Sequence, residues 1–214
     1  MKTLSIAACA ALFLASEASA VVTGGTLTGG AAFTAGGSFN ILTGGALTGL
    51  SVGNDTFNDN NVYAFNEDQN ITITTPITVD VGTSPTTGDV VASHYVFYDP
   101  PGTGGKSAIG YVLFDAMIYG VATSTTNLAN SDYLINNTVT YLNPSLRGLE
   151  AGDLVWIDSG NPYRLNYDWS AGTPGDYVRV FTMESPIAAA PLPAGGLLLL
   201  GALGALAVRR RKAG

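Results

Sequence analysis

The side chains that could carry catalysis are few in this chain of 214 residues. His94 is the only histidine, which excludes a metal site built from several imidazoles. The sequence also lacks a Gly-x-x-x-x-Gly-Lys-Ser/Thr phosphate loop and a His-Glu-x-x-His zinc motif. In a strand of period 2, His94 shares a face with Val96 and Tyr98, as a half-buried structural histidine would. We therefore predict no catalytic residue and no enzymatic activity.

Oxygen-bearing side chains gather in one stretch, where Asp55, Asn58 and Asp59 are followed by Asn60. Hard oxygen ligands of this kind are what calcium takes, although the spacing is not that of an EF-hand. Asn and Asp also populate turns because their side chains hydrogen-bond to the nearby backbone. The stretch is therefore either an ordinary turn or a calcium site, and calcium is the only cofactor that the sequence suggests.

Paired carboxylates are what a glycosidase would need, and Glu150 with Asp153 or Glu67 with Asp68 are pairs close in sequence. Nothing in the sequence places either pair in a cleft, so we interpret them as loop and turn residues. Aromatic residues offer another kind of site, because Tyr167 and Trp169 share one face of a regular strand. They could stack on a sugar, or they could pack in the core, as aromatic residues commonly do.

Charge excludes one class of partner. Residues 21–186 hold four basic and fifteen acidic side chains, a formal net charge of −11. A body this acidic is repelled by phosphate backbones, so we expect no nucleic-acid partner. The only cysteine, Cys9, lies near the N-terminus in a segment that we expect to be removed, which leaves the mature chain without disulfides or thiolate metal sites.

The elements that must position these residues are short strands. Alternating β-branched and aromatic residues separated by Gly, Pro, Asn and Asp predict strands at 62–65, 70–75, 77–81, 90–98, 109–114, 117–121, 138–142, 154–158, 163–169 and 177–182. One helical turn is expected at 124–130. Residues 54–186 are thus predicted to form an all-β domain, an antiparallel β-sandwich with a jelly-roll-like arrangement. Residues 21–53, which are rich in Gly and Thr, contain an approximate repeat at 23–30 and 43–50. The two repeats are expected to be strand-turn units with a strand at 33–42 between them, or else the whole stretch is a flexible linker.

Both ends of the chain carry export signals. Lys2, a short apolar segment and the small residues Ala18 and Ala20 are typical of a secretory signal peptide spanning 1–20. Residues 187–208 carry no charge, and about 20 apolar residues suffice for a membrane-spanning helix. The basic run that follows, Arg209, Arg210, Arg211 and Lys212, stays on the cytoplasmic side. We expect export across the inner membrane and a single-pass topology with the body outside.

The tail resembles a known sorting signal. Pro191, Leu192, Pro193 and Ala194, the apolar segment and the arginine-rich end are similar to the VPLPA-CTERM variant of the PEP-CTERM signals of Gram-negative bacteria, with Ala190 in place of the usual leading valine. The resemblance covers residues 187–212. It implies recognition by an exosortase, a membrane-embedded, cysteine-dependent protease or transpeptidase that cuts near the short motif. Segments 93–100, 114–116, 147–150 and 174–180 also resemble uncharacterised proteins with such a tail, which implies a shared sandwich and brings no activity.

These observations together predict an exported protein of the cell surface or extracellular matrix with a non-catalytic body. Its expected partners are the export machinery, an exosortase and the membrane. The alternative is a carbohydrate-binding module for the exopolysaccharide of the cell, with or without calcium. Polysaccharide binding by the body would separate the two.

Overall fold

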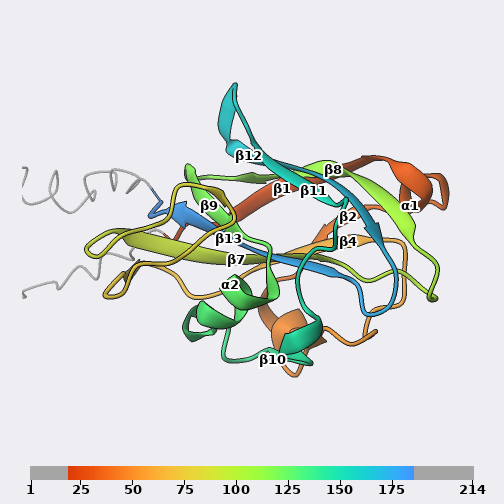
Figure 1. The fold of residues 1–214 in the computed structure, drawn as a ribbon, viewed down its shortest axis with the longest axis horizontal. Coiled ribbons are helices and arrows are strands. Elements are labelled where there is room, and N and C mark those ends of the chain that lie inside the picture. The colour runs from red at the N-terminus through yellow and green to blue at the C-terminus, as the bar shows by residue number, and fades with distance from the viewer. Residues whose placement is uncertain (1–18, 186–214) are drawn as a thin grey trace, which may run out of the picture. The chain divides into compact units, whose positions relative to one another are not determined.

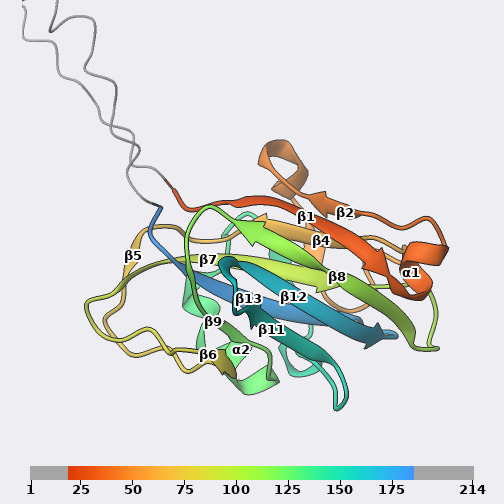
Figure 2. The same ribbon diagram turned by 90° about the horizontal axis from the view of Figure 1, so that it is seen from above.

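The computed structural model describes residues 19–185, which form two β-sheets stacked face to face (Figure 1). The smaller sheet has four antiparallel strands. In spatial order they are β1 (Val22–Gly29), β8 (Lys106–Phe114), β12 (Asn161–Ala171) and β11 (Leu154–Asp158). Viewed from above, these strands run alongside one another across the larger sheet (Figure 2).

The larger sheet has seven strands. Its path is β2 (Phe39–Ile41), β4 (Val62–Asn66), β7 (Val90–Tyr98), β13 (Asp176–Met183), β9 (Ile118–Ala122) and β6 (Val81–Gly82), with β5 (Ile71–Thr72) also paired to β7. All its pairings are antiparallel except that of β2 with β4. A separate parallel pair joins β3 (Ser51–Val52) to β10 (Thr140–Tyr141).

The first core fills the space between the two sheets. Side chains alternate across each strand, so every second residue points inward. Val96 and Val178 from the larger sheet pack with Val112, Tyr167 and Trp169 from the smaller one in a single buried cluster. Tyr167 lies over Gly110, where an added Cβ would overlap both the tyrosine hydroxyl and the backbone oxygen of Thr26. This glycine therefore makes room for a large aromatic side chain inside the sandwich.

A second core lies on the outer face of the larger sheet. Tyr95, Phe97 and Tyr177 point away from the first core, and the ring of Tyr177 stacks on those of Phe97 and Tyr95 at centroid distances of 5.8 and 6.0 Å. Covering them are α2 (Thr125–Asn130), η2 (Asp132–Leu134) and the β3–β10 pair, and η3 (Pro144–Leu146) lies next to α2. Figure 1 shows α2 and β10 on the opposite side of β7 from β8 and β12. The larger sheet is thus buried on both faces.

The β-sandwich predicted from the sequence is confirmed at this level, with two parallel pairings in addition to the antiparallel ones. The strands expected at 90–98 and 154–158 have those bounds in the structure. The helical turn expected at 124–130 is α2, whose first turn is capped by the Ser124 hydroxyl accepting from the Asn127 amide at 3.3 Å.

The glycine-rich stretch agrees with its prediction only in part. The first repeat forms the strand β1, as the strand-turn interpretation expected, and it is a full member of the smaller sheet rather than a linker. The strand expected at 33–42 is wrong over most of its length, because α1 (Gly30–Thr34) and a turn precede β2. Gly30, at φ 87°, redirects the chain at the end of β1. The second repeat is not a strand but the helical turn η1 (Gly44–Leu47).

The strand expected at 77–81 is also wrong, since only Val81–Gly82 pairs with a neighbour. Within residues 19–185, no helix is long and apolar enough to cross a membrane. Residues 1–18 of the predicted signal peptide and the whole predicted sorting tail, 187–212, lie outside the described residues.

Candidate functional sites

The loop predicted to be either a turn or a calcium site has the backbone of a series of turns. Asn54, Asp55 and Asn58 have φ values of 56°, 61° and 52°, a left-handed conformation that Asn and Asp tolerate better than most residues. Both Asp59 carboxylate oxygens already accept hydrogen bonds, one from the Asn61 amide at 2.7 Å and the other from the Tyr63 hydroxyl at 2.5 Å. The turn interpretation accounts for these contacts, and calcium binding by Asp55, Asn58 and Asp59 stays a prediction.

The Asp99 side chain binds the backbone of the same loop. One Asp99 oxygen accepts from the backbone amides of Thr56 and Phe57 at 2.8 and 2.9 Å. Burial raises the pKa of Asp99, and these two hydrogen bonds only partly offset the rise. The Asp55 carboxylate accepts from the Thr173 hydroxyl at 3.2 Å, which ties the loop to the segment before β13.

The two aromatic residues considered for sugar binding lie in the first core. Tyr167 and Trp169 are 0% and 1% exposed, and their rings stack on each other at 4.7 Å. Rings that solvent does not reach offer no face to a sugar. Of the two alternatives, the structure therefore supports core packing for both residues. The exposed tryptophan is instead Trp156 on β11, at 44%. By its register it lies beside Asn166 on the outer face of the smaller sheet.

His94 is fully buried rather than half-buried, and the face that it was predicted to share with Val96 and Tyr98 is the one turned toward the first core. Its Nδ1 lies 2.9 Å from the Asn66 side-chain oxygen, which also accepts from the Val22 amide. Nδ1 must therefore donate, and Nε2 accepts from the Thr182 hydroxyl at 3.0 Å. Burial lowers the pKa of His94 to about 3. The histidine is thus neutral and fully engaged, which leaves it no free nitrogen for proton transfer.

Gly49, Leu50, Ser51, Val52 and Gly53 fit the Gly-x-Ser-x-Gly pattern of a hydrolase nucleophile elbow. That motif requires a strand, a sharp turn and a helix, with a histidine within reach of the serine. Here Ser51 lies in β3, and only bends and turns follow Gly53. The single histidine is committed to Asn66 and Thr182. The geometry is not that of a serine hydrolase.

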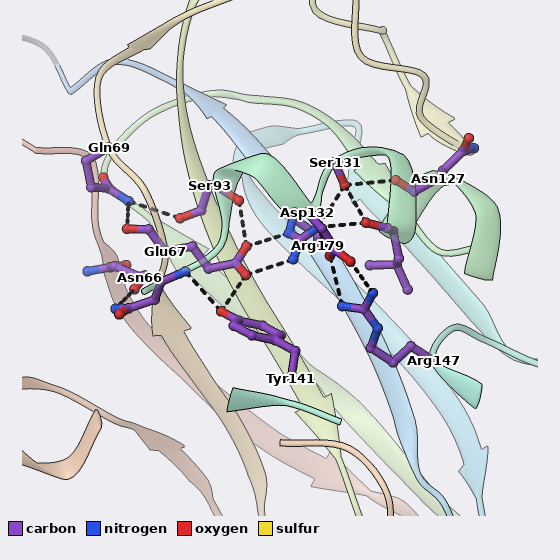
Figure 3. Close-up of polar contacts among 12 residues, drawn as sticks. Asn66, Glu67, Gln69, Ser93, Asn127, Ser131, Asp132, Tyr141, Arg147 and Arg179 are labelled. Carbon is purple, nitrogen blue, oxygen red and sulfur yellow. Dashed lines mark hydrogen bonds and ion pairs between the residues drawn. The ribbon is translucent and has the colours of Figure 1, made fainter. Parts of the chain in front are cut away.

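A cluster of ion pairs lies on the outer face of the larger sheet, between the sheet and the covering layer of α2 and η2 (Figure 3). Arg179 of β13 binds Glu67 with two hydrogen bonds, Nε to Oε2 at 2.6 Å and Nη2 to Oε1 at 3.0 Å. Both side chains are 0% exposed. The Ser93 and Tyr141 hydroxyls donate to the same carboxylate at 2.6 and 2.7 Å.

The remaining donors of Arg179 hold the covering layer. Its Nη1 donates to the Leu128 carbonyl at 2.9 Å, the Ser131 hydroxyl at 2.8 Å and Asp132 at 3.1 Å. Asp132 also accepts two bonds from Arg147, at 3.0 and 2.6 Å, as Figure 3 shows. Burial acts to lower the pKa of Arg179, but the charge of Glu67 and its hydrogen bonds raise the pKa overall. The cluster therefore fastens α2 and η2 to the sheet. Glu67, one of the carboxylates considered for glycoside cleavage, serves in it as the ion-pair partner of Arg179.

The two ends of the described body meet at Asp115. Its carboxylate accepts from the Val21 backbone amide at 2.7 Å and from the Ser185 hydroxyl at 3.0 Å. Ala20 is buried against Ala92 and Ala116. The predicted cleavage bond after Ala20 thus falls one residue before β1, and Ser185, the last described residue, lies close to it.

Three carboxylates, those of Glu150, Asp153 and Asp176, form the acidic group in residues 19–185 that could hold a metal ion. Each offers an oxygen within 4.8 Å of the others. Asp153 is oriented by backbone amides, those of Glu150 at 3.1 Å and Ser170 at 2.7 Å. Burial raises the pKa of Asp176 to about 8, and the charges of Asp153 and Glu150 add to the rise. Glu150 and Asp153 are close in sequence and were predicted as a possible carboxylate pair, whereas nothing in the sequence brings Asp176 near them.

Comparison of the chain with protein-family models, curated proteins and solved structures finds no match in any of the three.

Proposed function

We propose that this chain is an exported protein of the cell surface or extracellular matrix, with a non-catalytic β-sandwich as its body. Its destination is set by the C-terminal signal, in which Pro191, Leu192, Pro193 and Ala194 precede an apolar helix and a basic end. An exosortase cuts near the short motif after the basic run has stopped transfer at the inner membrane. We propose in addition that the sandwich is jelly-roll-like, since the chain crosses between the sheets from β7 to β8 and again from β8 to β9.

The observation that carries the proposal is the sequence of the tail, and the geometry of Asp115 supports it. One carboxylate holds both the Val21 amide and the Ser185 hydroxyl, so the chain enters and leaves the sandwich at one point. A chain that is cut at its N-terminal end and anchored by its C-terminal end is consistent with a body whose first and last described residues lie side by side.

A structural or interaction role for the body is supported by how its ionisable groups are used. His94, Glu67 and Arg179 all lie in cores with hydrogen bonds to neighbouring side chains. A general acid or base must be within reach of a substrate. These three groups instead make contacts within the folded body: His94 links strands of the larger sheet, and the Glu67–Arg179 pair fastens the covering layer to it.

The test of the proposal uses the prolines of the sorting motif. Proline fixes φ, removes a donor and keeps the preceding residue out of the helical region, so Pro191 and Pro193 hold the motif extended for a protease. Replacing both by alanine should make the full-length form accumulate in the inner membrane of the native host. A matched control changes Pro100 and Pro101, which lie in the turn after β7. If both double variants are processed like the wild type, the motif is not a cleavage signal and a plain anchor remains.

A second candidate function, polysaccharide binding, is favoured by the outer face of the smaller sheet. Trp156 is 44% exposed there, the partly exposed Asp168 lies near it on β12, and the Arg164 guanidinium lies 3.9 Å above the Tyr111 ring. An exposed aromatic face beside a carboxylate and a guanidinium group suits the apolar and hydroxyl surfaces of a sugar.

The polysaccharide hypothesis is tested by pull-down of the protein on exopolysaccharide from its host. We expect Trp156→Ala to abolish retention. Tyr163→Ala serves as control, because Tyr163 is similarly exposed at 40% but alternates to the other side of β12. Equal retention of the wild type and Trp156→Ala, or no retention of either, would leave this face without a sugar-binding role.

A further inference from the structure

Asp176 is a buried carboxylate without a partner. It is 0% exposed, and neither of its side-chain oxygens accepts a hydrogen bond. The ion pairs within residues 19–185 use Glu67, Asp132 and Asp158, so none of them neutralises Asp176. Buried carboxylates are ordinarily paired, hydrogen-bonded or bound to a metal, because leaving one bare costs several kcal/mol, on the order of the desolvation of an ion.

The carboxylates beside Asp176 raise the free-energy cost of burying its charge unless a cation lies between them. Oxygens of Glu150 and Asp153 approach those of Asp176, all within 4.8 Å of one another. The Tyr98 hydroxyl, on the strand paired with Asp176, is buried and unpartnered as well. The three carboxylates thus bring together groups of one sign of formal charge, and none of the ion pairs in residues 19–185 involves any of them.

The spacing of the three oxygens fits a single ion. Calcium binds oxygen at 2.3–2.6 Å, so two ligands of one calcium ion lie at most about 5 Å apart. The ligand set holds only carboxylates, without the sulfur or nitrogen that zinc or copper prefers. Magnesium demands a tighter octahedron with oxygens at 2.0–2.1 Å, whereas calcium accepts an irregular shell with water in the remaining positions. Glu150 is exposed, which leaves one side of the site open to that water.

We propose that Glu150, Asp153 and Asp176 bind one calcium ion, which links the two sheets at this end of the sandwich. Asp153 directly precedes β11 and accepts from the backbone of β12, while Asp176 begins β13 of the larger sheet. The ion would therefore hold the smaller sheet, the larger sheet and the loop that contains Glu150 in one place. The three carboxylates and an open side correspond to the affinity of extracellular calcium modules, with Kd of about 10⁻⁴–10⁻³ M.

This site differs from the loop of Asp55, Asn58 and Asp59 that the sequence suggested. It combines residues far apart in the chain, and it does not depend on whether the tail is processed.

The test measures the thermal midpoint of the full chain, purified in detergent and stripped with a chelator. Calcium binds only the folded state in this account, so at about 100 times its Kd it should raise Tm by about 5–10 °C. Isothermal titration with calcium chloride gives the stoichiometry directly, and we expect one ion per chain. Magnesium chloride at the same concentration should give a much smaller shift.

Two variants assign the site. Asp176→Asn keeps the shape of the side chain and removes its charge, and it should abolish the calcium shift without lowering the Tm of the stripped protein. Glu150→Gln, at an exposed position, should weaken calcium binding at least tenfold with the fold intact. Two charge-matched controls, Asp168→Asn on the outer sheet face and Asp55→Asn in the other loop, should retain the full shift.

The proposal is overturned if 10 mM calcium leaves the Tm of the wild type unchanged, or if Asp176→Asn and Glu150→Gln respond like the wild type. Loss of the shift in Asp55→Asn alone would move the ion to the loop after β3. An equal response to magnesium would overturn the assignment to calcium.

Discussion

Burial of His94 as a neutral side chain should make the protein sensitive to mild acid. The folded state holds the pKa of His94 at about 3, whereas in the unfolded chain it returns to its ordinary value of 6.5. Between these values the unfolded state binds a proton that the folded state does not. The free energy of unfolding therefore falls as the pH drops below 6.5, and this contribution is fully present above that pH.

The size of the effect follows from the same two values. Each pH unit below 6.5 costs about 1.4 kcal/mol, so His94 alone should remove about 2.7 kcal/mol between neutral pH and pH 4.5. Protonation would also put a donor on Nε2, which accepts from the Thr182 hydroxyl, and would bury a charge beside the Phe114 ring at 4.9 Å. That loss is a large part of the stability of an ordinary domain.

The assay is urea unfolding of the wild type and of His94→Gln at pH 7.5, 6.0 and 4.5. Glutamine can donate and accept as the neutral ring does, but does not titrate. It should be less stable than the wild type at pH 7.5 because it fills less of the core. The difference between the two proteins should then shrink by about 2.7 kcal/mol at pH 4.5, since the carboxylates contribute equally to both. Parallel stability curves would show that His94 is not held neutral by the fold.

Three further predictions concern the contacts that fasten the layers. Glu67→Gln removes the fully buried counter-charge of the Arg179 guanidinium, leaving only Asp132, which Arg147 shares, and should lower the free energy of unfolding by about 3–5 kcal/mol in urea titration, whereas an effect below 1 kcal/mol would contradict the assigned role. Gly110→Ala should cost about 1–3 kcal/mol because its methyl group has no space beside Tyr167, while Gly24→Ala, with open space around it, should stay within about 0.5 kcal/mol in the same assay. Asp115→Ala should speed limited proteolysis at both ends of the body, since it frees the backbone at 21 and the hydroxyl at 185 together, and unchanged cleavage at either end would refute that coupling.

Strand positions could be predicted where local pattern and tertiary burial agree. Residues 90–98 are β-branched and aromatic on both faces, and the structure uses both faces in two cores. Residues 154–158 alternate between exposed and partly buried positions, as an edge strand of a sandwich does. The stretch at 33–42 was predicted less well, because its glycines allow turns that hydrophobic alternation does not register.

The sites could not be predicted to the same degree, because their members are distant in sequence. Glu67 and Arg179 are 112 positions apart, and their pairing depends on the packing of β4, β7 and β13 side by side. Asp176 meets Glu150 and Asp153 only when β13 returns to the end of the sandwich near β11. Tyr167 and Trp169 showed the correct strand alternation, but alternation alone does not tell which face is the core.

The proposal of export and tail sorting is tested most directly by intact-mass spectrometry of the protein isolated from its native host, since one spectrum defines both ends. The account predicts a chain that begins at Val21 and lacks Arg209 to Lys212. A chain that begins at Met1, or one that keeps the basic end in a host encoding an exosortase, would contradict it.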